Sequence, residues 1–321
     1  MAQTDNSQRL VTLIGGSGFL GRHAVRALAK RGFRIRVGVR RPDLAGHLQP
    51  LGGVGQIAAV QANVRYPASL MAACEGADLV INFTGVLQSR GAQSFEAVHG
   101  FGAEATAKAA KAAGASQFIQ ISAIGADANS TAEYARSKAE GEARVKAHFA
   151  NASILRPSVV FGPEDDFFNR FALMARFSPA LPLIGGGDTK FQPVFVGDIA
   201  EAIATLAEQG SDGKIYELGG PEVMSFREVL EYVLQVTLRK RLLVPLPFPI
   251  ASLMGQMTGW LPGAPITADQ VELLKSDNIV SAAAKAEGRD LAGLGIQARS
   301  VESIVPSYLY RFRKAGQFSQ A

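Results

Sequence analysis

The stretch LVTLIGGSGFLG at residues 10–21 decides the fold. A short apolar run leads directly into a glycine-rich loop, a helix-forming segment follows at Arg22–Arg31, and a second apolar run spans Arg34–Val39. This is the order of a βαβ unit, in which glycines let backbone amides approach a pyrophosphate at the positive N-terminus of a helix. The loop therefore predicts dinucleotide binding, with contacts from Gly15, Ser17, Gly18, Phe19, Leu20 and Gly21.

Positive charge is concentrated directly after this loop. Residues 22–41 contain eight Lys or Arg and no Asp or Glu, so the rest of the chain is net negative although the whole chain carries +5. Arg40 and Arg41 end the second apolar run, where an acidic residue would otherwise bind the adenosine ribose. Guanidinium groups there favour a 2′-phosphate, because each charge-assisted hydrogen bond contributes about 1.5–3 kcal/mol. We therefore expect NADP(H) in preference to NAD(H), and no nucleic-acid partner.

Apolar strands alternate with alanine-rich helices through the first half of the chain, which predicts an α/β fold with a doubly wound parallel sheet. From residue 163 the chain is punctuated by Pro and Gly, which indicates a second, smaller α/β domain. We expect a dinucleotide-binding domain at 8–162 with a return at 194–219, and a substrate or partner domain at 163–193 and 220–321. The further strands are predicted at Gln56–Gln61, Leu79–Phe83, Phe118–Ile121 and Ser153–Val160, and the helices at 67–75, 94–113 and 132–150.

Several features limit the class of protein. The single cysteine, Cys74, excludes an internal disulfide, and the four histidines lack the spacing of metal ligands, so no metal site is expected. The polar N-terminus lacks a signal sequence, which predicts a cytoplasmic protein. The stretch Leu242–Ala268 has no formal charge and is long enough to cross a bilayer. Its five prolines confine any helix to about 250–261, so no transmembrane segment is expected.

A second chemical signal is the pair Tyr134 and Lys138, whose spacing places a phenol and an ammonium on one face of a helix. Such a lysine can lower the pKa of the phenol and hold the nicotinamide ribose. The phenol could then exchange a proton with a carbonyl during hydride transfer. Ser122 ends the preceding strand and would donate a hydrogen bond to that carbonyl. Tyr134, Lys138 and Ser122 are the predicted catalytic residues.

Together these motifs resemble the extended short-chain dehydrogenase/reductases over nearly the whole chain. Gly15, Gly18 and Gly21 match the Gly-x-x-Gly-x-x-Gly loop of that family. The resemblance implies cofactor contacts from both Tyr134 and Lys138. It further implies that the adenine is contacted by Asn63 and Val64, and the nicotinamide side by Thr84, Gly85 and Pro157.

A longer run, RPSVVFGPEDDFFNRF at residues 156–171, is similar to the NAD(P)H-binding accessory subunit of respiratory complex I and its bacterial relatives. This resemblance implies an NADP(H)-binding accessory or assembly subunit of a membrane-bound NADH:quinone oxidoreductase, with a mainly structural cofactor. It also implies complex I subunits as partners and a peripheral location on the inner face of the membrane. The alternative is an active NADP-dependent reductase, epimerase or dehydratase that acts on a sugar nucleotide or small carbonyl compound.

Two departures from the catalytic pattern bear on that choice. Aligning the strand on Phe118 and Ile119 places Ala123, rather than Ser122, at the position of the catalytic hydroxyl. A shift of one residue would restore Ser122, so both alignments stay open. His99 stands where catalytic relatives carry an Asn that supports the lysine through water, and a half-buried helix histidine is an equal interpretation.

An apolar stripe follows the basic triplet Arg239–Arg241. Its members recur at helical spacing and are Ile250, Leu253, Met254, Met257, Trp260 and Leu261. The stripe is either the core face of an ordinary helix or a docking surface. We favour contact with a protein partner at the membrane edge, and expect any peripheral membrane contact within 239–261.

Overall fold

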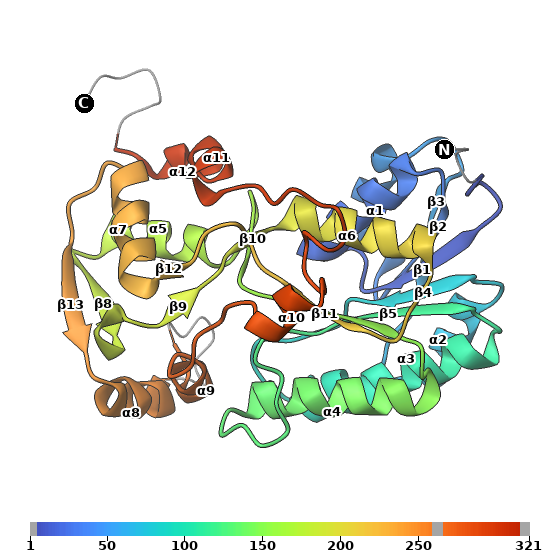
Figure 1. The fold of residues 1–321 in the computed structure, drawn as a ribbon, viewed down its shortest axis with the longest axis horizontal. Helices are drawn as coiled ribbons and strands as arrows, with labels where there is room; N and C mark the ends of the chain where they lie inside the picture. Colours follow the sequence, from blue (N-terminus) through green and yellow to red (C-terminus); the bar gives the residue numbers. More distant parts are fainter. Residues whose placement is uncertain (1–4, 259–265, 315–321) are drawn as a thin grey trace. The chain divides into compact units, whose positions relative to one another are not determined.

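The structure, a computed structural model, describes residues 5–258 and 266–314 (Figure 1). It contains a seven-stranded parallel sheet with the strand order β11-β6-β5-β4-β1-β2-β3. The order reverses between β1 and β4, so the loops that leave these two strands diverge at the carboxyl edge. The strands are β1 (Leu10–Ile14), β2 (Arg34–Val39), β3 (Ile57–Gln61), β4 (Leu79–Asn82), β5 (Gln117–Ile121), β6 (Ser153–Pro157) and β11 (Ile215–Leu218).

Helices cover both faces of this sheet (Figure 1). One face carries α1 (Phe19–Lys30) and α6 (Val196–Gln209), which contact each other. The other face carries α2 (Pro67–Cys74), α3 (Phe101–Ala112) and α4 (Glu133–His148). Alanines of α3 are buried against Phe118 and Val80 of the sheet, because small side chains let a helix approach closely. The doubly wound parallel α/β prediction is confirmed.

The chain separates into two compact units. The first contains residues 1–157, 196–218 and 282–296, and so holds the whole seven-stranded sheet. The second contains residues 158–195, 219–281 and 297–321. The return of 282–296, which includes α10 (Ala282–Ala286), to the first unit has no signal in the sequence pattern. It is anchored there by the backbone of Arg289, whose carbonyl accepts from the amide of Glu217 in β11 (2.9 Å).

The second unit is a smaller α/β assembly with two apolar clusters. Its helix α7 starts with a capping box in which Ser225 and Glu228 satisfy each other's backbone amides. Its short strands pair as β10 with β7, β12 with β9 and β13 with β8. The elements are β7 (Val160–Phe161), α5 (Phe168–Phe177), β8 (Ala180–Ile184), β9 (Lys190–Phe191), β10 (Val194–Phe195), β12 (Met224–Ser225), α7 (Phe226–Val236), β13 (Leu242–Leu246), α8 (Phe248–Thr258), α9 (Ala268–Leu273), α11 (Val301–Ile304) and α12 (Pro306–Leu309).

Several predicted elements differ in their bounds, and α1 begins at Phe19 rather than at Arg22. The strand predicted to run to Val160 ends at Pro157, because Ser158 and Val159 hydrogen-bond to Asn278 instead of to the sheet. The helix predicted over 94–113 begins as a π-helical turn at Glu96–Gly100 and continues as α3. Within residues 5–258 and 266–314, no helix combines the length and the apolar character needed to cross a bilayer.

Candidate functional site

The glycine loop lies where β1 ends and α1 begins, in the first unit. Gly15 has a φ of +82°, a conformation that side chains rarely adopt, and its amide donates to the carbonyl of Gly38 in β2 (2.8 Å). A Cβ on Gly21, in α1, would lie 2.6 Å from the Cα of Gly16 in the loop. The close packing of the helix on the loop therefore requires glycine at position 21. Gly16 is also confined by Leu13, 2.8 Å from its hypothetical Cβ.

Gly18 is the N-cap of α1, and no acidic residue lies in the first turn of the helix. The amides of this turn therefore present an uncompensated positive end to the loop. Gly18 is exposed, and Ser17, Phe19 and Leu20 are each partly exposed around it. The arrangement can accept a pyrophosphate at the start of α1.

The two arginines after β2 differ in their surroundings. The guanidinium of Arg41 donates twice to the carboxylate of Asp43 (2.6 and 3.1 Å). Arg40 is exposed and has no hydrogen bond or ion pair with any residue in the part of the chain that the structure describes. Arg40 therefore has its full charge available for a ligand, whereas Asp43 offsets that of Arg41. The sequence predicted the same role for both arginines, although Asp43 follows Arg41 by only two residues.

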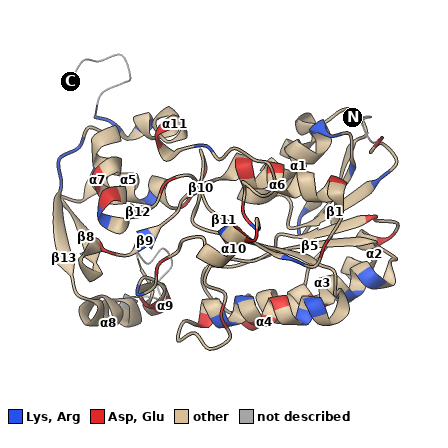
Figure 2. Ribbon diagram, viewed as in Figure 1, with Lys and Arg blue, Asp and Glu red and all other residues tan. Residues whose placement is uncertain are grey.

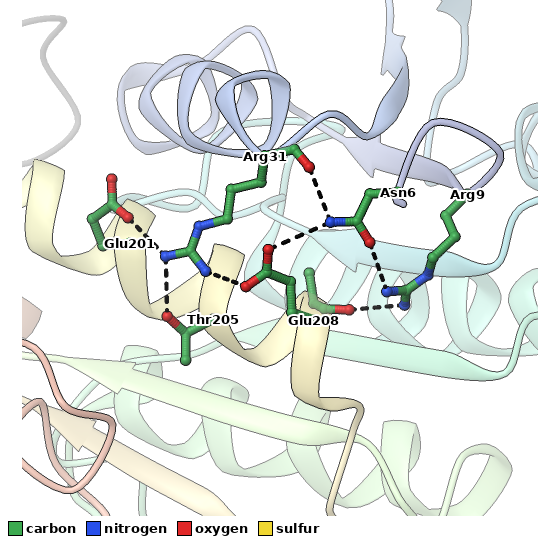
Figure 3. Close-up of polar contacts among 7 residues, drawn as sticks. Asn6, Arg9, Arg31, Glu201, Thr205 and Glu208 are labelled. Carbon is green, nitrogen blue, oxygen red and sulfur yellow. Dashed lines mark hydrogen bonds and ion pairs between the residues drawn. The ribbon is translucent and has the colours of Figure 1, made fainter. Parts of the chain in front are cut away.

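Other charges of the basic run serve the fold (Figure 3). Arg31, at the end of α1, forms ion pairs with Glu201 (3.0 Å) and Glu208 of α6. Glu208 also accepts from Asn6 (3.4 Å), and Asn6 accepts from Arg9 (3.3 Å). This network joins two helices on one face of the sheet. The charge at 22–41 is therefore only partly directed at a ligand.

The loops after β3 and β4 supply further candidates at the same edge of the sheet. The side-chain oxygen of Asn63 accepts from the backbone amide of Arg65 (3.1 Å), and Val64 is buried in the core. The amide and hydroxyl of Thr84 both donate to the side-chain oxygen of Asn82 (3.1 and 2.6 Å). The side-chain nitrogen of Asn82 in turn donates to the side-chain oxygen of Gln120 in β5 (3.0 Å). Asn82 and Gln120 therefore fix Thr84.

These two supporting residues were missed at the sequence level. Asn82 and Gln120 are both buried polar side chains in strands that are otherwise mostly apolar. Buried polar groups require hydrogen-bond partners, so their position near the carboxyl ends of neighbouring strands was an available signal.

Lys138 is buried beneath the loop that carries Gly85. Its side chain projects from α4, only 7% of the residue is exposed, and a Cβ on Gly85 would lie 3.3 Å from its Nζ. Burial lowers the pKa of Lys138 to about 8, and the neighbouring carboxylate of Glu142 opposes that shift. The Nζ lies 5.7 Å from the centroid of the half-buried Tyr134 ring. The structure thus brings together Tyr134 and Lys138, which were selected by their spacing, and Gly85, which was implied by the family resemblance.

Ser122 has a different environment. Its hydroxyl donates to Oε1 of Glu142 (2.5 Å), and the guanidinium of Arg156 donates to both oxygens of the same carboxylate (2.8 and 2.6 Å). Ser122 and Glu142 are buried, whereas Ala123 is partly exposed. The hydrogen bond to Glu142 raises the pKa of Arg156, and burial opposes that shift. We refer to Ser122, Glu142 and the partly exposed Arg156 as the buried triad, because the carboxylate that joins them is buried.

The remaining predicted residues lie beside this triad. Pro157 is buried at the end of β6, where it stands opposite Leu218 of β11. His99 is buried at the end of the π-helical turn, where Nε2 accepts from the amide of Val86 (3.0 Å) and Nδ1 contacts Ser137 Oγ (2.8 Å). His99 is therefore a buried residue with both ring nitrogens in hydrogen bonds, rather than a half-buried one.

Comparisons with known proteins agree with this geometry. Residues 15–166 match a protein family described as NAD(P)H-binding. The fold is shared with an NADPH-dependent quinone oxidoreductase of Escherichia coli solved with NADPH, which has a TM-score of 0.72 and 22% identity and is matched over 94% of this chain and 99% of that one. The chain thus has the doubly wound fold of a nicotinamide-dinucleotide-binding protein, with the glycine loop at the start of the matched region.

Relatives with higher sequence identity indicate a more specific family within this class of dinucleotide-binding proteins. NADH dehydrogenase [ubiquinone] 1 alpha subcomplex subunit 9 of Arabidopsis thaliana is 36% identical, over 96% of this chain and 79% of that protein. A ceramide reductase of Caulobacter vibrioides is 38% identical, over 56% of this chain and 55% of that protein. The chain belongs to the family of complex I alpha subcomplex subunit 9.

Proposed function

We propose that this protein is an NADP(H)-binding accessory or assembly subunit of a membrane-bound NADH:quinone oxidoreductase, in which the dinucleotide mainly stabilises the fold. The observation that carries the proposal is the 36% identity to a complex I alpha subcomplex subunit over 96% of the chain. A ligand that binds only the native state stabilises it in proportion to the logarithm of its concentration over its dissociation constant. Complex I subunits are the proposed partners.

The residues present suit the dinucleotide. Gly15, Gly18 and the start of α1 would hold the pyrophosphate, and Arg40 would bind a 2′-phosphate. Asn63 and the backbone at Val64 would face the adenine. Thr84, Gly85, Tyr134, Lys138 and Pro157 would surround the nicotinamide ribose and ring. When bound, the nicotinamide could supply hydride chemistry, and the protein would supply the orientation of the ring.

The buried triad supports a structural rather than a catalytic cofactor. A hydroxyl that stabilises a reacting carbonyl must donate its proton to that carbonyl. The proton of Ser122 is donated to Glu142, whose other contacts come from Arg156. Ala123, the next residue, has no hydroxyl to offer. Two of the three groups needed for carbonyl chemistry, Tyr134 and Lys138, then remain to bind the ribose.

A surface of the second unit supports contact with a membrane. We define the β13–α8 surface by its exposed apolar side chains, which are Leu242, Val244, Ile250, Leu253, Met254 and Met257. The predicted stripe is thus on the surface in the described part of α8, while Trp260 and Leu261 lie outside the described residues. On the opposite side of α8, a Cβ on Gly255 would lie 2.6 Å from the amide of Ala268, so that side packs on α9.

Positive charge accompanies this surface. Residues 167–187 and 232–268 contain five Lys or Arg and no Asp or Glu. Burial, together with the nearby charges of Arg241 and Arg176, lowers the pKa of Arg239, so the guanidinium groups are clustered. Figure 2 shows β13 and α8 themselves without charged residues. The stripe by itself favours a protein partner at the membrane edge, but exposed apolar side chains that follow a cluster of cations complement an anionic phospholipid surface, and we place the peripheral contact there.

The membrane contact can be tested by flotation with vesicles of phosphatidylcholine, with and without phosphatidylglycerol. The double variant Leu253→Asp with Met257→Asp should lose flotation with the anionic vesicles, because both substitutions put negative charge on the exposed face of α8. Val54→Asp puts the same charge on a fully exposed apolar side chain of the first unit and is the control. Equal flotation with neutral and anionic vesicles would contradict the lipid assignment, and capture of the protein by partner subunits alone would favour a protein surface.

The function itself is tested by a pull-down from membranes in mild detergent. We expect complex I subunits in the eluate together with bound NADP(H), and slow release of the cofactor without turnover. Lys138→Ala should reduce cofactor retention much more than it changes any rate of NADPH oxidation. An eluate without complex I subunits would contradict the proposal.

A working reductase is the second candidate function, and epimerase or dehydratase activity belongs to the same alternative. The 38% identity to a ceramide reductase and the adjacent Tyr134 and Lys138 favour it. With this function, Tyr134 would exchange the proton and Lys138 would support it. NADPH oxidation on a panel of carbonyl substrates, abolished by Tyr134→Phe, would establish this alternative and overturn the structural role of the cofactor.

A further inference from the structure

His99 occupies the junction between two parts of the candidate site. It lies in the π-helical turn Glu96–Gly100 of the first unit and is 3% exposed. Its ring is stacked on Phe95, with centroids 5.4 Å apart, and meets the ring of Tyr134 edge-on at 5.6 Å. One ring nitrogen is hydrogen-bonded to Val86 in the loop after β4, and the other is hydrogen-bonded to Ser137 of α4.

The directions of the hydrogen bonds fix the proton on the ring. The amide of Val86 can only donate, so Nε2 of His99 accepts and carries no hydrogen. The hydroxyl of Ser137 donates to the carbonyl of Tyr134 (2.7 Å), so its oxygen accepts from Nδ1–H of His99 (2.8 Å). The imidazole is therefore neutral, with its proton on Nδ1. Burial, with the charge of Lys138, lowers the pKa of His99 to about 3 and agrees with that state.

The space around the ring is closed. A Cβ on Gly85 would lie 3.5 Å from Nε2 of His99 and 3.3 Å from Nζ of Lys138. A Cβ on Gly141 would lie 2.2 Å from the carbonyl oxygen of His99, so α4 packs directly on the backbone of this residue. The loop, the ring and α4 thus form one packed unit in which the loop cannot move away from Lys138 without breaking the bond from Val86.

We propose that His99 is a positioning residue that holds the loop Thr84–Val86 against Lys138 and thereby slows release of the dinucleotide. The inference rests on the proposed function, because it requires NADP(H) bound against this loop. Both ring nitrogens are engaged in fixed bonds to the protein, so the ring holds its neighbours together and does not pass protons between them. The bond from Val86 is the one that restrains the loop.

Three substitutions of His99 distinguish the effects of its two hydrogen bonds, to Val86 and to Ser137. The amide oxygen of Gln can reach the position of Nε2, so His99→Gln keeps an acceptor for Val86. Asn reaches only the position of Nδ1, so His99→Asn keeps the contact with Ser137 and loses the restraint on the loop. His99→Ala loses both. His148→Ala, which removes a partly exposed imidazole that contacts Glu104 in the last turn of α4, is the control.

The measurement is the rate at which bound NADPH leaves the full-length protein when excess NADP⁺ is added. We expect His99→Ala and His99→Asn to release NADPH about tenfold faster, as loss of one neutral hydrogen bond predicts. His99→Gln should stay within about threefold of the wild-type rate. Equal rates in Asn and Gln variants, or unchanged release in the Ala variant, would overturn the proposal.

NMR spectroscopy of the wild-type protein is a second test, and it does not depend on whether the variants fold. In protein with ¹⁵N-labelled imidazoles, His99 should show a protonated Nδ1 and an unprotonated Nε2 at pH 7, and the amide of Val86 should exchange slowly with solvent. A proton on Nε2 or fast exchange at Val86 would refute the restraint. A further outcome is a wild-type protein that shows the protonated Nδ1 and the slowly exchanging Val86 amide and yet binds no NADPH. That result would contradict the proposed function and the effect on release, while the hydrogen bonds of His99 would stand.

Discussion

The two ends of the candidate dinucleotide site are built differently. The adenosine end carries exposed charge, with Arg40 exposed to solvent and Arg41 paired to Asp43. The nicotinamide end is buried and interconnected, with Lys138 and His99 beneath the loop after β4, and Glu142 held between Ser122 and Arg156. An exposed charge can select a ligand with little influence on folding, whereas a buried charge must first be compensated by the fold. Substitutions at the two ends should therefore differ in kind.

The largest effect is expected in the buried triad. Arg156→Ala leaves the buried carboxylate of Glu142 without its bidentate partner, which should lower the free energy of unfolding by about 3–5 kcal/mol. Urea denaturation measures this loss. Glu140→Ala removes an exposed carboxylate of the same helix, paired with Arg144, and should change stability by less than about 1 kcal/mol. Equal losses in the two variants would remove the contrast between buried and exposed charge.

A second effect concerns pH. The pKa of Lys138 is lowered from its ordinary value of 10.5 to about 8, so the unfolded chain binds more protons than the native one between these values. Stability should consequently rise with pH between about 8 and 10.5, by up to about 3 kcal/mol from this group. Lys138→Met should lack that contribution. Parallel stability–pH curves for the two proteins over this window would show that the amine is not desolvated.

The smallest effect in free energy is expected at the adenosine end, where it changes selectivity. Arg40→Asp should reverse the preference for NADPH over NADH, with a loss of about tenfold or more in NADPH affinity. Arg41→Asp should have a weaker effect, because Asp43 already offsets that charge. Titration with both cofactors measures the ratio, and neither variant should change the midpoint of urea denaturation appreciably. Similar affinity of the wild-type protein for both cofactors would contradict the role of Arg40.

The position of much of the site could be predicted because its signals are local. The loop Gly15–Gly21 follows an apolar strand directly, and Tyr134 and Lys138 are one helical turn apart. The βα alternation placed these segments near one edge of a parallel sheet, since such strands all end there. Family resemblance added Thr84 and Asn63, which composition and spacing would not have selected.

The sequence by itself therefore determined the doubly wound fold, the glycine loop and the Tyr–Lys pair, since each depends on the period of a strand or helix or on the conformational freedom of glycine. Only the tertiary structure decided what the polar side chains bond. Ser122 meets Glu142 and Arg156 through helix and strand packing, and His99 reaches Ser137 across 38 residues. The exposure of the α8 stripe was likewise undecided, because the same helical spacing describes a face turned to the core or to solvent. Periodicity fixes which residues share a face, and packing fixes what that face meets.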